Sequence, residues 1–267
     1  MQRLLRHIVT RHRRSRVARA LANRCRELVD AYENLNYDTH SNGEQALLRR
    51  LQAAAGGELD TVFDVGAHTG GWALSAGAAL PRATLHLFEV APALAARLRT
   101  RLDGDDRYVV NGFGLADEDG EVDLFVDPGN SELTTLVDYR REKLTEMARG
   151  RVRTGDGYLD ERGIARVGLL KVDAEGAEHR VLRGFGRAFA SGRIDVVQFE
   201  YGQVNIVTHF LLRDFYRFFT EHGFRVGKLY PEGVAFRDYE LRHEDFRGPN
   251  YVAVRRERDD VVAALTR

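Results

Sequence analysis

The apolar positions of this chain form short runs that alternate with longer segments of helical spacing. Short apolar runs predict buried strands, and apolar residues three or four positions apart predict helices that pack on them. The predicted strands are 62–65, 84–88, 109–111, 121–126, 151–159, 167–172, 194–199, 224–229 and 251–254. The predicted helices are 1–35, 44–55, 72–80, 92–102, 178–185 and 209–221.

This alternation predicts an α/β fold with a seven-stranded, mostly parallel sheet, an antiparallel terminal strand and helices on both faces. We expect an N-terminal helical extension over 1–56, whose second helix caps the ligand site. The α/β domain is expected over 57–257 and a C-terminal tail over 258–267. From 127 to 150 the pattern weakens into a polar loop and a charged helix, which is typical of a lid or substrate loop.

The first predicted strand ends in an acid and is followed by a glycine-rich turn. Asp64 lies near the end of the strand, and Gly66 and Gly70 follow before a segment of helical spacing begins. This arrangement predicts a strand, a tight turn and a helix start, and glycine in such a turn lets the backbone approach a ligand closely. The spacing differs from the three-glycine turn of nicotinamide enzymes, and no phosphate-binding P-loop motif is present.

A second acid, Glu89, follows the second predicted strand. A carboxylate at this position of a βαβ unit binds the hydroxyls of an adenosine ribose. The acid in the first turn would repel a pyrophosphate but suits a cationic ligand, and S-adenosylmethionine fits. A structural turn with incidental acids is the alternative. We expect the following residues to bind the cofactor: Asp64, Gly66, Ala67, His68, Thr69, Gly70, Glu89, Asn111 and Asp173.

Two later strands also end in carboxylates, namely Asp173 with Glu175, and Glu200. Because ligands of an open parallel sheet lie outside the carboxyl ends of its strands, we expect these acids to share one crevice with Asp64. Acids that merely form turns at strand ends are the alternative explanation.

Acids gathered in such a crevice can act as a general base or can bind a metal ion that activates a hydroxyl group. Asp173 is the first candidate for the base, and we expect Glu175 and Glu200 to raise its proton affinity. Alternatively, Asp173 and Glu200, together with His179, hold Mg²⁺, which prefers oxygen ligands. His68 and His179 are alternative bases.

Charge is unevenly distributed although the net charge is zero. Nine arginines precede the first acid, Glu27, so the remainder of the chain carries 40 acidic against 31 basic residues. The arginine-rich start is expected either to contact an anionic membrane surface or to pack on its own domain or on a second subunit, as in a homodimer. The neutral total and the acidic body argue against nucleic acid as the substrate.

Cysteine content and hydropathy predict a protein of the cytoplasm. The single cysteine, Cys25, excludes a disulfide framework and fits a reducing compartment. No apolar run approaches the length of a membrane span, and the N-terminus lacks the apolar core of a signal peptide.

The sequence resembles the FkbM family of S-adenosylmethionine-dependent methyltransferases over roughly 37–254. The segments that carry the resemblance are 42–44, 63–67, 88–89, Asn111, 170–178 and 199–201. The run 170–178 is much more specific than the first turn, which many methyltransferases share. His68 stands where the family often has Asn, and Ala174 where Val is common, and these departures affect the substrate side of the site.

The resemblance implies a Rossmann-like class I methyltransferase fold over 57–257. It further implies methyl transfer to a hydroxyl of a sugar, glycolipid or polyketide-type acceptor. Two alternatives stay open at this point: a nicotinamide-dependent oxidoreductase and a non-catalytic nucleotide-binding module.

Overall fold

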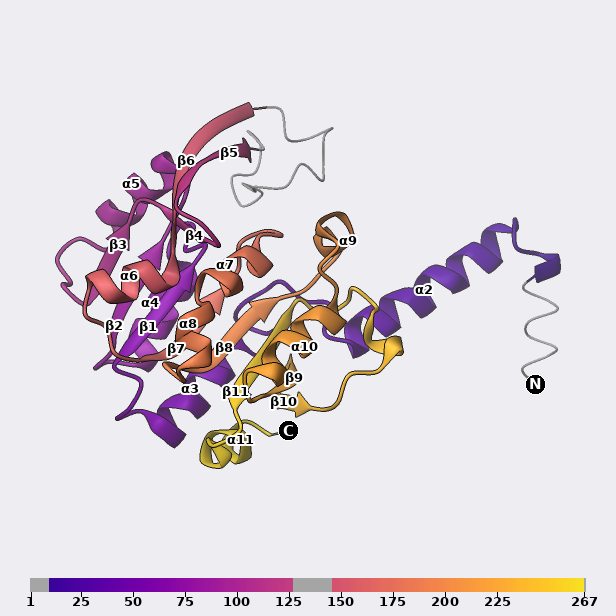
Figure 1. Ribbon diagram of the computed structural model, residues 1–267. Coiled ribbons are helices and arrows are strands. Elements are labelled where there is room, and N and C mark those ends of the chain that lie inside the picture. The colour runs from indigo at the N-terminus through magenta and orange to yellow at the C-terminus, as the bar shows by residue number, and fades with distance from the viewer. Residues whose placement is uncertain (1–9, 127–145, 267) are drawn as a thin grey trace.

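The computed structural model describes residues 10–126 and 146–266. Eight strands form the main sheet in the order β10-β9-β11-β8-β7-β1-β2-β3, and helices cover both of its faces (Figure 1). These strands are β1 Thr61–Val65, β2 Thr84–Phe88, β3 Tyr108–Asn111, β7 Val167–Val172, β8 Ile194–Glu200, β9 Phe224–Tyr230, β10 Gly233–Phe236 and β11 Asn250–Arg255.

Five neighbouring strands, from β3 to β8, run parallel, and β11 is antiparallel to both β8 and β9. The predicted α/β class and the mostly parallel sheet are therefore confirmed. The sheet has eight strands rather than seven because β10 folds back on β9 as a hairpin at the edge.

A second, three-stranded sheet has the order β4-β6-β5, with β4 Gly114–Ala116, β5 Gly120–Val126 and β6 Glu146–Thr154. The predicted strand 151–159 is therefore wrong beyond Thr154. The Thr154 hydroxyl accepts a hydrogen bond from the Gly157 amide at 3.3 Å and caps a helix that starts at Gly155. Of the segment 127–150, residues 146–150 belong to β6 rather than to a loop or helix, and the predicted lid otherwise lies outside the described residues.

The helices are α2 Arg16–Tyr32, α3 Glu44–Ala55, α4 Gly71–Ala79, α5 Pro92–Arg101, α6 Gly155–Glu161, α7 Glu178–Gly184, α8 Gly186–Ala190, α9 Val204–Thr208, α10 Leu212–Glu221 and α11 Asp259–Leu265, with a short 3-10 helix η2 at Leu241–His243. The predicted helix 1–35 is interrupted, because Ser15 caps α2 after a turn at 12–14. The predicted helix 209–221 starts late, because His209 has a left-handed φ of 56°. None of the described helices is long and apolar enough to cross a membrane.

Side chains alternate between two cores, one on each face of the main sheet. Phe63 and Leu170 point into a core with α6, α7, α8 and α10, whereas their neighbours Val62 and Leu169 point into a core with α3, α4 and α11. All six residues of β7 are buried, as expected for a central parallel strand. Burial on both faces fixes the strands, so their carboxyl ends form a defined edge.

The two ends of the chain differ in how they join this body. Helix α2 has no buried residue, whereas α3 buries Leu47, Leu48 and Leu51 and packs against α11. Residues 258–267, expected as a tail, contain α11 with Val261 and Leu265 fully buried. The domain boundaries at 56 and 257 stay a prediction.

Candidate active site

A cavity of about 650 Å³ lies at the carboxyl ends of β1, β2, β7 and β8. Its walls come from the turns that follow these strands, from the segment before α3 and from the start of α9. This is the edge where open α/β sheets bind ligands. The sequence-predicted residues that line the cavity are Gly66, Ala67, His68, Thr69, Glu89, Asp173, Glu175 and Glu200.

The first turn is closed by backbone contacts that only glycine permits. Gly66 has a φ of 86°, and a Cβ at this position would lie 1.8 Å from the carbonyl oxygen of Asp173. The Gly66 and Ala67 amides both donate to the Phe88 carbonyl, at 3.0 and 3.1 Å. The Asp173 amide donates to the Val65 carbonyl at 3.0 Å. The ends of β1, β2 and β7 are thereby held together beneath the cavity.

Glu89 holds the turns after β1 and β2 in place. Its two carboxylate oxygens accept hydrogen bonds from the His68 and Ala91 amides, each at 2.8 Å. The side chain is buried at the cavity wall, and this burial raises the pKa of Glu89. Glu89 thus combines a structural role with a carboxylate edge at the position expected to meet a ribose.

Asp64 lies below the cavity and is not among its lining residues. Its side chain is fully buried, and neither carboxylate oxygen has a hydrogen-bond partner among the described residues. The closest cation is Lys171, whose Nζ lies 3.5 Å from Oδ1. Burial raises the pKa of Asp64 to about 6. A direct role of Asp64 in cofactor binding stays a prediction.

Lys171 is a buried cation within the run 170–178, and the sequence alone indicated no separate role for it. Its Nζ donates to Asp173 at 2.9 Å, lies 3.5 Å from Asp64, and sits 5.5 Å from the centre of the Trp72 ring. Burial opposes its charge, but Asp173, Asp64 and Glu44 outweigh burial and raise the pKa of Lys171. A lysine inside an otherwise apolar strand, two residues before an acid, was the signal for this pair.

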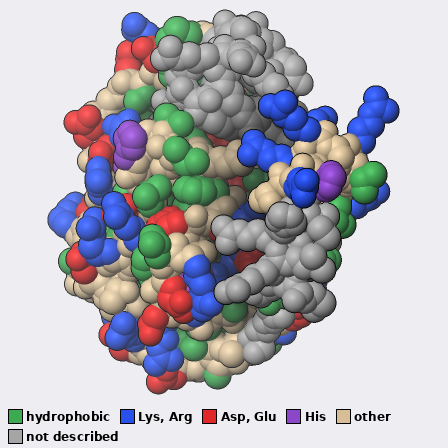
Figure 2. Space-filling model, turned by 90° about the vertical axis from the view of Figure 1, so that its right-hand side faces the viewer, with side chains coloured by type: hydrophobic (Ala, Val, Ile, Leu, Met, Phe, Trp, Pro, Cys, Tyr) green, Lys and Arg blue, Asp and Glu red, His purple; other side chains and the backbone are tan. Residues whose placement is uncertain are grey.

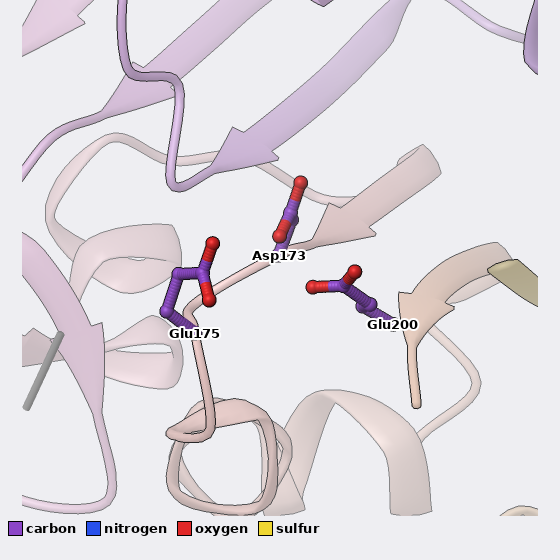
Figure 3. A group of neighbouring side chains, drawn as sticks. All are labelled: Asp173, Glu175 and Glu200. Atoms are coloured by element: carbon purple, nitrogen blue, oxygen red, sulfur yellow. The ribbon is translucent and has the colours of Figure 1, made fainter. Parts of the chain in front are cut away.

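Asp173, Glu175 and Glu200 converge from the ends of β7 and β8 (Figure 3). One carboxylate oxygen of each lies within 4.8 Å of one oxygen of the other two. Three carboxylates this close repel one another, so the cluster retains a proton or binds a cation. The expectation that these strand-end acids come together is confirmed for these three residues.

The pKa values of Glu200 and Asp173 are shifted in opposite directions. Burial raises the pKa of Glu200 well above its usual range, and the charges of Asp173, Glu175 and Glu178 raise it further. Burial also acts to raise the pKa of Asp173, but Lys171 outweighs it, so that this pKa is lowered. The expectation that its neighbours raise the proton affinity of Asp173 is therefore wrong, because the sequence does not reveal the lysine beside it.

Glu178 shapes the loop that carries this cluster. Its Oε1 accepts hydrogen bonds from the Ala174 and Gly176 amides, at 2.9 and 3.1 Å, and stabilises a turn in which Glu175 has a φ of 48°. Burial raises the pKa of Glu178 to about 7. Glu178 also lines the cavity, and the sequence analysis gave it no role.

Three other sequence-predicted residues lie away from the cavity wall. The ring of His179 stacks on Phe210 at 5.3 Å, and burial lowers the pKa of this histidine. The Asn111 side chain donates to the carbonyls of Leu87 and Val109. Gly70 begins α4 with a φ of 82°. Roles for these residues as base or cofactor contact stay predictions.

The opposite wall is polar and was largely missed. Buried Glu44 accepts hydrogen bonds from the Asn42 and Gln198 side chains, and Asn250 accepts from Gln198 at 3.0 Å. The Nδ2 of buried Asn205 lies at this wall without a hydrogen-bond partner among the described residues. Asparagines in turns are common, so the sequence alone gave no reason to place them together.

The chain was compared with protein-family models, curated proteins and solved structures. Residues 64–226, more than half of the chain, match the model of the methyltransferase FkbM domain. No curated protein matches.

Several solved structures are similar at low sequence identity. One is an O-methyltransferase from Bacillus cereus in complex with SAH, at 11% identity and a TM-score of 0.45, covering 85% of this chain and 86% of that one. Another is precorrin-6y C5,15-methyltransferase from Geobacter metallireducens, at 12% identity and a TM-score of 0.39, covering 77% and 86%. A third is a putative RNA methyltransferase from Pyrococcus horikoshii, at 16% identity and a TM-score of 0.36, covering 79% and 81%. On the strength of the family model, the chain belongs to the FkbM family of methyltransferases.

Proposed function

We propose that this protein is an S-adenosylmethionine-dependent O-methyltransferase acting on an uncharged, hydroxyl-bearing acceptor such as a sugar, a glycolipid or a polyketide-type molecule. The observation that carries the proposal is a single cavity that joins the Glu89 turn to the cluster of Asp173, Glu175 and Glu200. Membership of a methyltransferase family argues against a nicotinamide oxidoreductase.

The β1–β2 side of the cavity suits the cofactor. Gly66 exposes backbone at the cavity floor, and Glu89 presents a carboxylate at the end of β2. Acidic groups around the cavity favour a ligand that carries a sulfonium and an ammonium group. When bound, S-adenosylmethionine would supply a methyl group on a positively charged sulfur, and this sulfur would be the leaving group when an acceptor oxygen attacks the methyl carbon in line.

The acceptor side favours a neutral molecule. Lys171 is the only lysine or arginine among the described lining residues, and it is already paired with Asp173 and Asp64. An anionic acceptor would meet carboxylates without a free counter-charge, whereas asparagine side chains such as Asn205 and Asn250 suit hydroxyl groups. These features support a hydroxyl-rich acceptor.

Asp173 is positioned to take the acceptor proton. Its side chain is 38% exposed, its pKa is lowered, and it is therefore ionised at neutral pH. Asp173 would accept the hydroxyl proton of the acceptor as the methyl group is transferred, and Glu200 would stay hydrogen-bonded to Asp173. Positioning and proton removal are the two contributions that this chain makes to the reaction.

Mg²⁺ bound by Asp173 and Glu200, with Glu175 as a third oxygen ligand, is the alternative means of activating the hydroxyl. Three carboxylate oxygens within 4.8 Å suit a hard cation, which would replace the proton held by Glu200. Treatment with EDTA followed by addition of Mg²⁺ tests this alternative. Activity that responds to neither leaves proton transfer to Asp173 as the mechanism.

Two measurements test the proposed function as a whole. Calorimetry of the full chain should detect binding of S-adenosylmethionine, and nicotinamide cofactors serve as the control. A screen of hydroxyl-bearing acceptors, with mass detection, should find a product heavier by one methylene group. Absence of cofactor binding would contradict the proposal and favour the non-catalytic module.

A further inference from the structure

Helix α2 presents an apolar stripe that nothing in the described chain covers. Val17, Leu21, Leu28 and Tyr32 follow one another at four, seven and four residues, so they lie along one face of the helix. No residue of α2 is buried, and Leu28 is 71% exposed. A stripe of this kind needs an apolar surface to cover it, because exposed apolar patches mark interaction sites.

The stripe belongs to an arm that is fixed at one end. Near its C-terminal end, Asp30 pairs with Arg247, and the adjoining Glu33 pairs with buried Lys228, both at 2.7 Å. The Asn34 side chain donates to the Leu229 carbonyl at 3.0 Å. The rest of the helix projects away from the sheet (Figure 1). Its direction is therefore set by the body of the protein.

The arm is strongly basic, and one of its arginines, Arg24, lies on the stripe itself, seven residues after Val17 and four before Leu28. All nine residues that carry full charge before Glu27 are arginines, and four of them, Arg16, Arg19, Arg24 and Arg26, lie in α2. Figure 2 shows basic side chains gathered on the protruding part of this face of the molecule. An apolar stripe flanked by arginines is the pattern of helices that lie in the interface of an anionic bilayer.

The arm is continuous with the mouth of the cavity. Leu35 and Tyr37, which follow α2 directly, line the cavity together with Gln203 and Val204 at the start of α9. Helix α9 and the base of α2 lie on the same side of the sheet (Figure 1). Apolar side chains on these two segments are exposed, namely Tyr37 before α3 and Ile206 and Val207 in α9.

We propose that α2 and the exposed side of α9 dock the protein on an anionic lipid surface, with the mouth of the cavity turned toward the headgroups. Each arginine near such a surface contributes about 1 kcal/mol of attraction. A second copy of the chain is a poorer occupant, because pairing two arms would bring together the seven described arginines that precede Glu27 in each copy. Nucleic acid would pair with the arginines but would leave the apolar stripe uncovered.

Docking also narrows the acceptor class. Together with the methyl transfer proposed above, this orientation selects hydroxyls on lipid-linked headgroups, which reach the cavity without leaving the bilayer. The docking itself does not depend on that reaction. It is therefore tested by binding alone, so a failed acceptor screen and a failed docking experiment are distinguishable.

The test is co-flotation of the full chain with vesicles of phosphatidylcholine, either alone or mixed with phosphatidylglycerol. We expect binding to the mixed vesicles only, weakened by salt. The double variant Leu21→Ser and Leu28→Ser should lower vesicle affinity at least about tenfold. The matched control is Leu241→Ser in η2, which removes an 80% exposed leucine from the body and should bind as the native chain does. Circular dichroism and melting temperature confirm that the variants fold.

Several results would overturn the docking proposal. These are no flotation with either vesicle, equal flotation with neutral vesicles, or equal loss in the Leu241→Ser control. A dimer of the native chain that forms through the arm, cross-links through Cys25 and is lost in the double variant would assign the stripe to a second copy. Binding to RNA that the double variant retains, without vesicle binding, would assign the arginines to nucleic acid.

Discussion

The two halves of the cavity use carboxylates in opposite ways. On the β1–β2 side, each oxygen of Glu89 accepts a backbone N–H, and the turn is closed by further backbone bonds. On the β7–β8 side, carboxylate oxygens of Asp173, Glu175 and Glu200 lie within 4.8 Å of one another, and burial and the neighbouring charges raise the pKa of Glu200. The β1–β2 side, whose carboxylate is hydrogen-bonded to the backbone, is suited to holding a ligand. The β7–β8 side, whose carboxylates lie close together and have shifted pKa values, is suited to moving a proton.

The largest effect that separates the two sides is expected for Asp173→Asn. The substitution preserves the shape of the side chain but removes the ionised oxygen that accepts the acceptor proton. Turnover should fall by about 10²- to 10⁴-fold, as is typical for loss of a general base, while cofactor affinity by calorimetry changes little. The matched control is Asp117→Asn, which makes the same change in the Arg180 ion pair away from the cavity. Full activity of Asp173→Asn would exclude this residue as base or metal ligand.

Lys171→Met tests whether the lysine sets the protonation of the catalytic side. Removing this cation leaves Asp64 and Asp173 as unpaired acids, and the free energy of unfolding should fall by about 3–5 kcal/mol. The pKa of Asp173 should rise, so the acid limb of the pH–activity profile moves to higher pH. The control is Lys228→Met, which removes another fully buried lysine, paired with Glu33. Both variants should lose stability, but only Lys171→Met should move the profile. A profile that is unchanged would assign Lys171 a structural role alone.

Glu89→Ala tests the ligand-holding side. The His68 and Ala91 amides lose their acceptor, and a bound ribose loses a carboxylate. We expect cofactor affinity to fall about tenfold to a hundredfold, since hydrogen bonds to charged groups contribute about 1.5–3 kcal/mol. Asp156→Ala is the control, because Asp156 also accepts two backbone N–H groups, from Arg187 and Ala188, far from the cavity. Equal cofactor affinity in both variants would remove Glu89 from the binding site.

A further expected effect is a dependence of stability on pH that comes from Glu178. Burial raises its pKa from 4.5 to about 7, so the folded protein binds the proton more tightly than the unfolded chain does. The contribution of this proton to the free energy of unfolding is complete below pH 4.5 and is lost as pH rises to about 7. Glu178→Gln should flatten the decline of melting temperature over this interval. The same substitution at Glu118, whose side chain is 82% exposed, should leave the decline unchanged, and an unaltered slope in Glu178→Gln would contradict the assignment.

Much of this architecture was predictable because strand ends are marked locally. The acids at the ends of β2, β7 and β8 follow apolar runs, and parallel strands bring such ends to one edge. The sheet and its cavity edge were therefore found from the sequence. The sequence failed where a local pattern was ambiguous: Thr154 ends β6 and caps a helix, although 151–159 also fits a strand. It failed in the same way at Ser15, which divides an otherwise continuous helical pattern.

By itself, the sequence determined the family, the parallel strands of the main sheet and the set of acids at the strand ends, because each depends on residues close together along the chain. Only the tertiary structure decided in which direction the pKa of each acid is shifted, that Asp64 lies beneath the cavity, and that α2 leaves its apolar face uncovered. These properties depend on distances between remote residues, such as Lys171 to Asp64, and on burial. Electrostatic energies vary with separation and solvent access, which a linear pattern does not record.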